Sequence, residues 1–225
     1  MIRDSAVAIL CGGKSIRMGA DKGLVPLCGK PMLLYVLEVC GELFSEIFVV
    51  LGSNVNKSYE GLIGDRARIL KDKFPDINSP LVGAYTAFEN CEDDYLYILS
   101  CDMPLVNTEV LRLMREVITT ENAVIPRWPN GYIEPLHSIY RTKPSREAAK
   151  KALEENRRDI RSLLKNLDKV LYLSTNVIQQ LDPKLETFFN VNTMNELKKA
   201  ENRVKKRYKE KPKIKFPSSK RRSKY

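Results

Sequence analysis

The chain has 225 residues, of which 43% are hydrophobic, enough for one globular domain with a full core. No apolar run approaches the roughly 20 residues that span a bilayer, and the short apolar run before Gly12 is typical of a buried strand rather than a signal peptide. Residues 203–225 carry twelve Lys or Arg and one acid, a charge of +11. Since the whole chain has a net charge of +10, residues 1–202 together carry −1. The basic character therefore belongs to the C-terminal end.

In the first half of the chain, short β-rich apolar runs alternate with helical patterns, which predicts βαβ units and a mostly parallel sheet. We expect strands over residues 6–10, 47–51, 67–70 and 95–99, and helices over residues 31–37, 81–91 and 107–119. Pro31 suits the first position of a helix. The pattern predicts the α/β class.

The second half is less regular. We expect strands over 123–125, 132–140, 169–173 and 187–191, the first of them ending at Pro126, and helices over 144–154, over 159–166 and from Met194. With no internal repeat or long linker, residues 1–202 are predicted to form a single domain. Residues 203–225 are predicted to form a basic extension, partly helical and then disordered beyond about Lys211, where apolar periodicity ends.

The five cysteines are odd in number and scattered, without a C-x-x-C pair. A disulfide framework or a zinc site is therefore not predicted. We interpret the cysteines as small buried hydrophobic residues of a protein in a reducing compartment, the cytoplasm.

A loop rich in glycine and cations follows the first predicted strand, where open α/β sheets place their ligands. Gly12 and Gly13 let the backbone pass close to a flat ligand. Lys14, Arg17 and Lys22 supply cations that can neutralise a triphosphate and a departing pyrophosphate. The loop predicts a phosphate-binding site, and its alternative interpretation is a simple turn.

Two better-known glycine loops do not match this segment. In G-x-x-x-x-G-K-[ST] four residues separate the glycines, whereas five separate Gly13 from Gly19, and Ala20 follows. The G-x-G-x-x-G pattern is also absent.

Asp102 directly follows the predicted strand over 95–99, so its carboxylate should lie at the same edge of the sheet as the glycine loop. Such a carboxylate can hold Mg²⁺, which takes a few protein oxygens and completes its shell with water and phosphate. The alternative is a turn or N-cap aspartate before the helix over 107–119. Beside the glycine loop, the metal-binding interpretation is favoured.

The segment LCGGKSIRMGADKGLVPLCGKPML, residues 10–33, resembles the signature of nucleotidyltransferases that act on molybdopterin and related acceptors, the MobA family, with the molybdenum cofactor guanylyltransferases as the nearest group. The resemblance continues through ILKD, SPLVGAYTA, SCDMPLV, EPLHSIY, RRDIRSLL and FFNVNTMNEL. It covers roughly residues 5–202. It implies a Rossmann-like three-layer domain with a mostly parallel, mixed sheet, similar to nucleotide-diphospho-sugar transferases.

The resemblance also implies roles for individual residues. Those implied to read guanine or contact the nucleotide are Leu10, Cys11, Gly12, Gly13 and Asp72. Those implied to bind phosphates or metal are Arg17, Lys22 and Asp102. Asn190 and Asn192 match asparagines near the acceptor, and turn residues are their alternative. Cys11 stands where the family more often has alanine, and the family's asparagine after the second strand has no clean match. His137 falls in an acceptor-side segment, although a lone histidine is more often structural than catalytic.

The implied reaction transfers GMP from GTP to the terminal phosphate of molybdenum-bound molybdopterin, with Mg²⁺ as cofactor and release of pyrophosphate. Related alternatives are CTP-dependent cytidylyl transfer to molybdopterin and guanylyl transfer to a cobinamide phosphate. The resemblance also implies transient contact with proteins that deliver molybdopterin or receive the product. A function of another class is nucleic-acid binding through the basic tail, where cations and aromatic side chains suit phosphate and base contacts.

Overall fold

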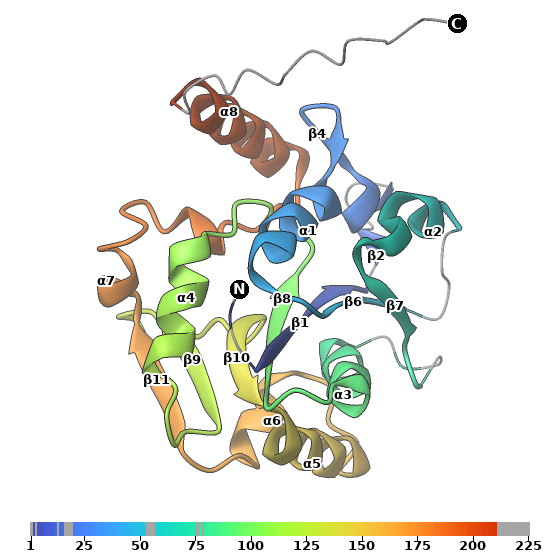
Figure 1. The fold of residues 1–225 in the computed structure, drawn as a ribbon, viewed down its shortest axis with the longest axis vertical. Coiled ribbons are helices and arrows are strands. Elements are labelled where there is room, and N and C mark those ends of the chain that lie inside the picture. The colour runs from blue at the N-terminus through green and yellow to red at the C-terminus, as the bar shows by residue number, and fades with distance from the viewer. Residues whose placement is uncertain are drawn as a thin grey trace, which may run out of the picture.

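A computed structural model describes residues 2, 4–12, 14–15, 20–52, 57–74, 77 and 79–210. Its centre is a seven-stranded sheet in the order β11-β9-β10-β8-β1-β6-β7, which crosses the molecule in Figure 1. The strands are β1 (Ser5–Cys11), β6 (Ile47–Leu51), β7 (Arg68–Lys71), β8 (Tyr95–Ser100), β9 (Ala123–Arg127), β10 (His137–Arg141) and β11 (Val170–Ser174). β10 is antiparallel to β8 and β9, whereas the other neighbouring pairs are parallel. The predicted mixed, mostly parallel sheet is confirmed.

Helices cover both faces of the sheet. The α-helices are α1 (Met32–Leu43), α2 (Ser58–Ile63), α3 (Pro80–Asn90), α4 (Thr108–Val117), α5 (Thr142–Glu154), α6 (Arg161–Lys165), α7 (Thr175–Ile178) and α8 (Met194–Glu210). Shorter elements are the 3₁₀ turns η1 (Lys22–Leu24), η2 (Gly64–Arg66) and η3 (Glu186–Phe188), and the paired short strands β2 (Lys14–Ser15) with β3 (Ala20–Asp21) and β4 (Pro26–Leu27) with β5 (Lys30–Pro31). Within the described residues, no helix is both long and apolar enough to cross a membrane.

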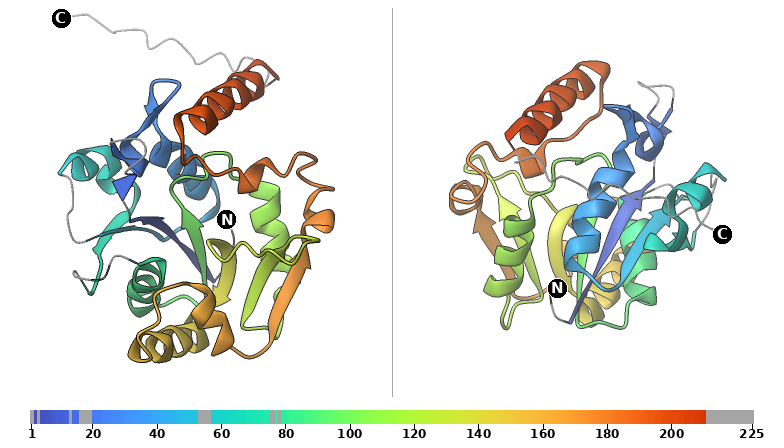
Figure 2. Two further views of the ribbon diagram at one scale, coloured as in Figure 1. Left: turned by 180° about the vertical axis from the view of Figure 1, so that it is seen from behind. Right: turned by 45° about the horizontal axis from the view of Figure 1, so that its top comes forward.

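The alternation of side chains along the central strand creates two cores. In β1, Val7, Ile9 and Cys11 pack with α1 and α4 on one face. Ala6, Ala8 and Leu10 pack with α3, α5 and α6 on the other. Figure 2 shows the resulting three layers from behind and with the top of the molecule tilted forward. After Ser5 the strand is entirely apolar, because both of its faces are covered.

A third, smaller core joins the C-terminal helix to the hairpin β4–β5. Leu197, Ala200 and Val204 of α8 pack with Leu27 and Leu105. Figure 1 shows α8 beside β4, outside the three layers. The helix continues past residue 202 to Glu210. Residues 211–225 lie outside the described part of the chain.

The second half departs from the predicted elements. The strand expected to end at Pro126 extends to Arg127, because proline lacks an N–H but its carbonyl still accepts a bond from the Glu134 N–H at 3.0 Å. The strand expected over 132–140 begins only at His137, and residues 133–134 turn back on β9. No strand forms over 187–191 among the described residues, because Leu185 is left-handed and starts the turn η3.

Candidate active site

The glycine loop and Asp102 meet where the sheet changes direction. The chain runs from β1 to β6 and β7 on one side and returns to β8 on the other, a switch point that open α/β sheets use for ligands. Leu10 pairs in register with Ser100, and the Cys101 N–H donates to the Leu10 carbonyl at 3.2 Å. The two loops predicted to share an edge of the sheet are therefore side by side.

A lysine from the first loop joins two later segments of the chain. The Lys22 Nζ donates to Asp102 Oδ2 at 2.9 Å and to Asn192 Oδ1 at 2.5 Å. The Ser100 hydroxyl donates to the other Asp102 oxygen at 2.6 Å, and the Val191 N–H donates to the Asp102 carbonyl at 2.9 Å. Three predicted site residues thus form one hydrogen-bonded cluster, which we call the Lys22 cluster (Lys22, Asp102 and Asn192).

Lys22 is held by a close approach of the backbone to α2. The Tyr59 hydroxyl bonds the Asp21 carboxylate, and the Tyr59 ring is buried beneath η1. A Cβ on Gly23 would lie 2.7 Å from the Tyr59 hydroxyl oxygen, so only glycine fits without displacing the tyrosine. The tyrosine and the glycine together fix the position from which Lys22 reaches Asp102.

The two asparagines lie between η3 and α8. Asn190 lines a cavity beside Asp102, whereas Asn192 belongs to the Lys22 cluster. The Asn192 N–H donates to Glu196 at 2.8 Å, a bond that lowers the pKa of the Glu196 carboxyl. The turn therefore aims the side-chain amide of Asn192 at Lys22, and its role near the acceptor stays a prediction.

A cavity of about 70 Å³, here the inner cavity, opens between the glycine loop and α3. Its lining includes Leu10, Gly12, Val50, Asp72, Gly83 and Ser100. Asp72 Oδ1 is buried and has no hydrogen-bond partner in the described part of the chain, and burial raises the pKa of Asp72 to about 6. A buried acceptor without a donor suits a ligand that carries N–H groups.

A second cavity of about 430 Å³, the outer cavity, lies beside Asp102. It shares Ser79, Pro80, Ser100 and Leu136 with the inner cavity, so the two are contiguous. Its remaining lining is Asp102, Met103, Tyr132, Glu134, Pro135, Arg158, Asp159, Ile160, Arg161 and Asn190. Asp102 of the Lys22 cluster thus lines the outer cavity and bonds Ser100, which lines both of the spaces that together could hold two reactants.

The far wall of the outer cavity was not predicted as a site. Arg158, Arg161, Tyr132 and Glu134 come from segments that are distant in sequence from the glycine loop. The segment RRDIRSLL contains the two arginines, and the segment EPLHSIY begins with Glu134. The resemblance of these segments to the family was the sequence signal for this wall. Periodicity could not place them, because residues 132–136 were expected to be a strand.

Other predicted residues are accounted for differently. Gly13 and Arg17 lie outside the described residues, and Cys11 is buried at the end of β1. His137 is fully buried, contacts Thr187 at 3.1 Å and lines neither cavity; burial lowers its pKa to about 3. Four cysteines are buried as expected, but Cys28 is exposed at the turn of the hairpin β4–β5, a correction to the prediction.

Asp72→Asn should stabilise the free protein at neutral pH. The folded-state pKa of about 6 exceeds the ordinary value of 3.8, so ionised Asp72 weakens folding above pH 6, and this penalty fades as pH falls towards 4. After allowance for solvent access we expect ~1–2 kcal/mol, or a rise of about 3–6 °C in Tm at pH 7.5. Thermal unfolding of both proteins from pH 4 to 8 measures it. A Tm difference that does not change with pH would contradict the stated cause.

Comparisons with known proteins show the family to which the chain belongs. The model of the MobA-like NTP transferase domain matches residues 7–170. A probable molybdenum cofactor guanylyltransferase from Methanothermobacter thermautotrophicus is 34% identical over 198 residues, which cover 86% of this chain and 97% of that protein. A protein of the same description from Natranaerobius thermophilus is 32% identical, covering 89% and 96%.

Solved structures show the same fold. The crystal structure of molybdopterin-guanine dinucleotide biosynthesis protein A from Archaeoglobus fulgidus matches with a TM-score of 0.76 and 28% identity, covering 89% of this chain and 99% of that one. The 4-diphosphocytidyl-2C-methyl-D-erythritol synthase from Anaerococcus prevotii matches with a TM-score of 0.67 at 14% identity, a likeness of fold alone. Sequence and architecture agree, and the chain belongs to the family of MobA-like NTP transferase domains.

Proposed function

We propose that this protein transfers GMP from GTP to the terminal phosphate of molybdopterin, forming the guanine dinucleotide form of the molybdenum cofactor. The observation that carries the proposal is the Lys22 cluster, whose Asp102 lines the outer cavity and bonds Ser100, a residue that lines both cavities. The nucleobase would occupy the inner cavity and the acceptor the outer one. Their phosphates would then meet beside Lys22 and Asp102.

The reaction is an in-line displacement at the α-phosphorus of GTP. An oxygen of the acceptor phosphate forms the new O–P bond, and the bond to the β-phosphate oxygen breaks, with its electron pair leaving on pyrophosphate. Both reactants are anions, so alignment and charge neutralisation should dominate catalysis. Lys22, which bonds Asp102, and Arg158 and Arg161, which line the outer cavity, supply cations for this neutralisation. In the free protein Lys22 is engaged by Asp102 and Asn192, and we expect it to turn towards the triphosphate.

The donor set fits Mg²⁺ held together with a nucleotide. Asp102 is 7% exposed and lines the outer cavity, so its carboxylate can reach a ligand there. No group of three His, Cys, Asp or Glu suited to a metal occurs among the described residues. Mg²⁺ needs one or two carboxylates when phosphates and water complete its shell. Asp102 would hold the ion, which supplies charge neutralisation at the phosphates.

The inner cavity supports guanine as the base. Asp72 Oδ1 is a buried acceptor, and the guanine edge presents two neighbouring N–H donors, N1–H and the 2-amino group. Cytosine presents one amino group beside acceptors. Leu10 and Gly12 add backbone groups along the same wall. We expect a larger thermal shift with GTP than with CTP, and a larger shift with CTP would move the proposal to cytidylyl transfer.

The direct test combines labelled GTP, Mg²⁺ and molybdopterin with the purified protein. Formation of labelled dinucleotide together with pyrophosphate is the expected result. Pyrophosphate release only with another acceptor, such as a cobinamide phosphate, would overturn the choice of acceptor and keep the chemistry. Incubations without Mg²⁺ test the metal separately.

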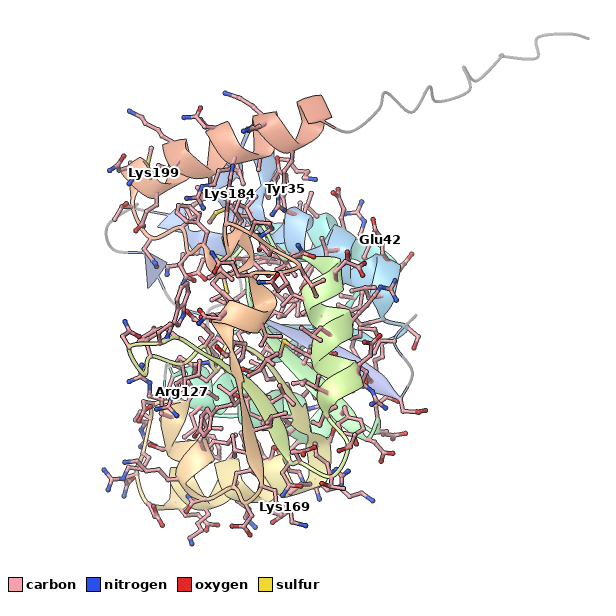
Figure 3. The ribbon with its side chains drawn as sticks, turned by 90° about the vertical axis from the view of Figure 1, so that its left-hand side faces the viewer. Tyr35, Glu42, Arg127, Lys169, Lys184 and Lys199 are labelled. Atoms are coloured by element: carbon pink, nitrogen blue, oxygen red, sulfur yellow. The ribbon has the colours of Figure 1, made fainter. Side chains whose placement is uncertain are left out.

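Deletion of residues 211–225 should leave guanylyl transfer within about twofold of the full chain, because the described site lies within residues 10–192. Figure 3 shows that cations such as Lys184 and Lys199 also lie at the α8 end of the molecule. Salt-dependent binding to single-stranded RNA, measured by fluorescence anisotropy, tests the role of the tail. A large loss of guanylyl transfer after the deletion would contradict the prediction that the domain is active without residues 211–225.

A further inference from the structure

A carboxylate is buried in the far wall of the outer cavity. Glu134 is 6% exposed, and the Trp128 indole N–H donates to its Oε1 at 2.8 Å. Among the described residues, the Trp128 indole is the hydrogen-bond partner of the Glu134 carboxylate. Burial raises the pKa of Glu134, and the Trp128 hydrogen bond and the Arg161 charge oppose that effect. Because Glu134 lines the outer cavity, its second carboxylate oxygen can accept a hydrogen bond from a ligand there.

The backbone holds Glu134 in place. Its N–H donates to the Pro126 carbonyl at 3.0 Å, and its carbonyl accepts bonds from the His137 N–H at 3.0 Å and the Ser138 hydroxyl at 2.6 Å. With the Trp128 bond, main chain and side chain are both fixed before any ligand binds. Preorganisation of this kind is typical of a residue that selects its ligand.

An aromatic ring lies in the same wall. Tyr132 is 52% exposed and lines the outer cavity, and the Arg161 guanidinium lies 5.1 Å from the centre of its ring. An exposed aromatic face backed by a cation is a platform on which a flat heterocycle can stack. The wall thus offers a stacking surface beside a fixed hydrogen-bond acceptor.

We propose that Glu134 determines acceptor specificity by accepting hydrogen bonds from the 2-amino-4-oxopyrimidine edge of the acceptor's pterin. The inference rests on the proposed function, since it needs a pterin acceptor in the outer cavity. That edge carries an amino group and a ring N–H side by side, and an ionised carboxylate is an acceptor only. Trp128 is a positioning residue, because it directs Oε1 and leaves Oε2 to the ligand.

A matched pair of fluorescent probes tests this assignment. 6-Hydroxymethylpterin phosphate carries the 2-amino group, and 6-hydroxymethyllumazine phosphate carries a 2-oxo group in its place. The wild-type protein should bind the pterin probe at least about tenfold more tightly by fluorescence titration, because the lumazine oxygen would face a carboxylate. Equal affinities would overturn the proposal without any variant.

Glu134→Gln adds a second test. Its Oε1 can still accept from Trp128, but its Nε2 would donate into the cavity, so the preference should fall at least about tenfold and move towards lumazine. Trp128→Phe should weaken the preference less. The control Glu147→Gln changes an exposed glutamate that pairs with Arg146 and should change nothing. Equal weakening of both probes in Glu134→Gln would indicate a structural role and overturn the proposal.

The outcome is separable from that of the proposed function. Dinucleotide formation by the wild type together with an unchanged probe preference in Glu134→Gln would refute the role of Glu134 alone. Absence of dinucleotide formation with a probe preference that depends on Glu134 would refute guanylyl transfer and keep the pterin site.

Discussion

Asp102→Ala is expected to lower the turnover number for guanylyl transfer about 100-fold or more. The substitution removes the carboxylate that we expect to hold Mg²⁺, and it removes the partner that Lys22 and Ser100 share. Without a held Mg²⁺ ion, the negative charge that develops during transfer would lack its main neutralising cation. Steady-state rates of dinucleotide formation, measured over a range of Mg²⁺ concentrations, give the size of the effect.

The control for this variant is Ser100→Ala, which removes the hydroxyl bound to Asp102 Oδ1 but keeps the carboxylate. It should cost about tenfold or less. Circular dichroism and thermal unfolding establish whether each variant is folded. Near-normal turnover in a folded Asp102→Ala protein would remove Asp102 from the proposed metal site.

The sequence predicted the central strands well because their environment is simple. β1, β6 and β8 are buried on both faces, so continuous apolar runs mark them, and β6 coincides with the predicted range. Chain reversal after β7 then brings β1 and β8 together. The glycine loop and Asp102 each follow a parallel strand, so a βαβ pattern predicts that they lie at the same edge of the sheet. The order of β1 and β8 in the sheet then places them side by side.

Where long-range contacts decide the structure, prediction failed. Residues 187–191 look like a strand, but the Asp182 carboxylate accepts from the Thr187 N–H at 2.8 Å, and Val191 bonds the Asp102 carbonyl. These partners lie far away in sequence or depend on a left-handed Leu185. The same limit hid Glu134, whose place in the outer cavity depends on a turn back towards Pro126. Local patterns contain no information on such contacts.

Lys22→Met is expected to reduce kcat about 100- to 1,000-fold, the cost of removing one preorganised donor from a transition state that gathers negative charge. The Lys22 ammonium donates hydrogen bonds to both Asp102 and Asn192. Tyr59 and Gly23 fix the turn that contains Lys22. Lys22→Arg should restore only part of the kcat lost in Lys22→Met, because the planar guanidinium group cannot make the same contacts as the compact ammonium group.

The kinetic signature separates a catalytic Lys22 from one that only binds nucleotide. If its contacts strengthen as charge moves onto pyrophosphate, kcat falls more than KM for GTP rises. The control Lys30→Met removes a cation that pairs with Glu38 and lies 3.8 Å from the centre of the Tyr35 ring, in the hairpin β4–β5. Its kcat should not change. A rise in KM with normal kcat in Lys22→Met would show that Lys22 contributes equally to the bound substrate and the transition state, and the charge neutralisation would then fall to the Mg²⁺ ion that Asp102 would hold beside the outer cavity.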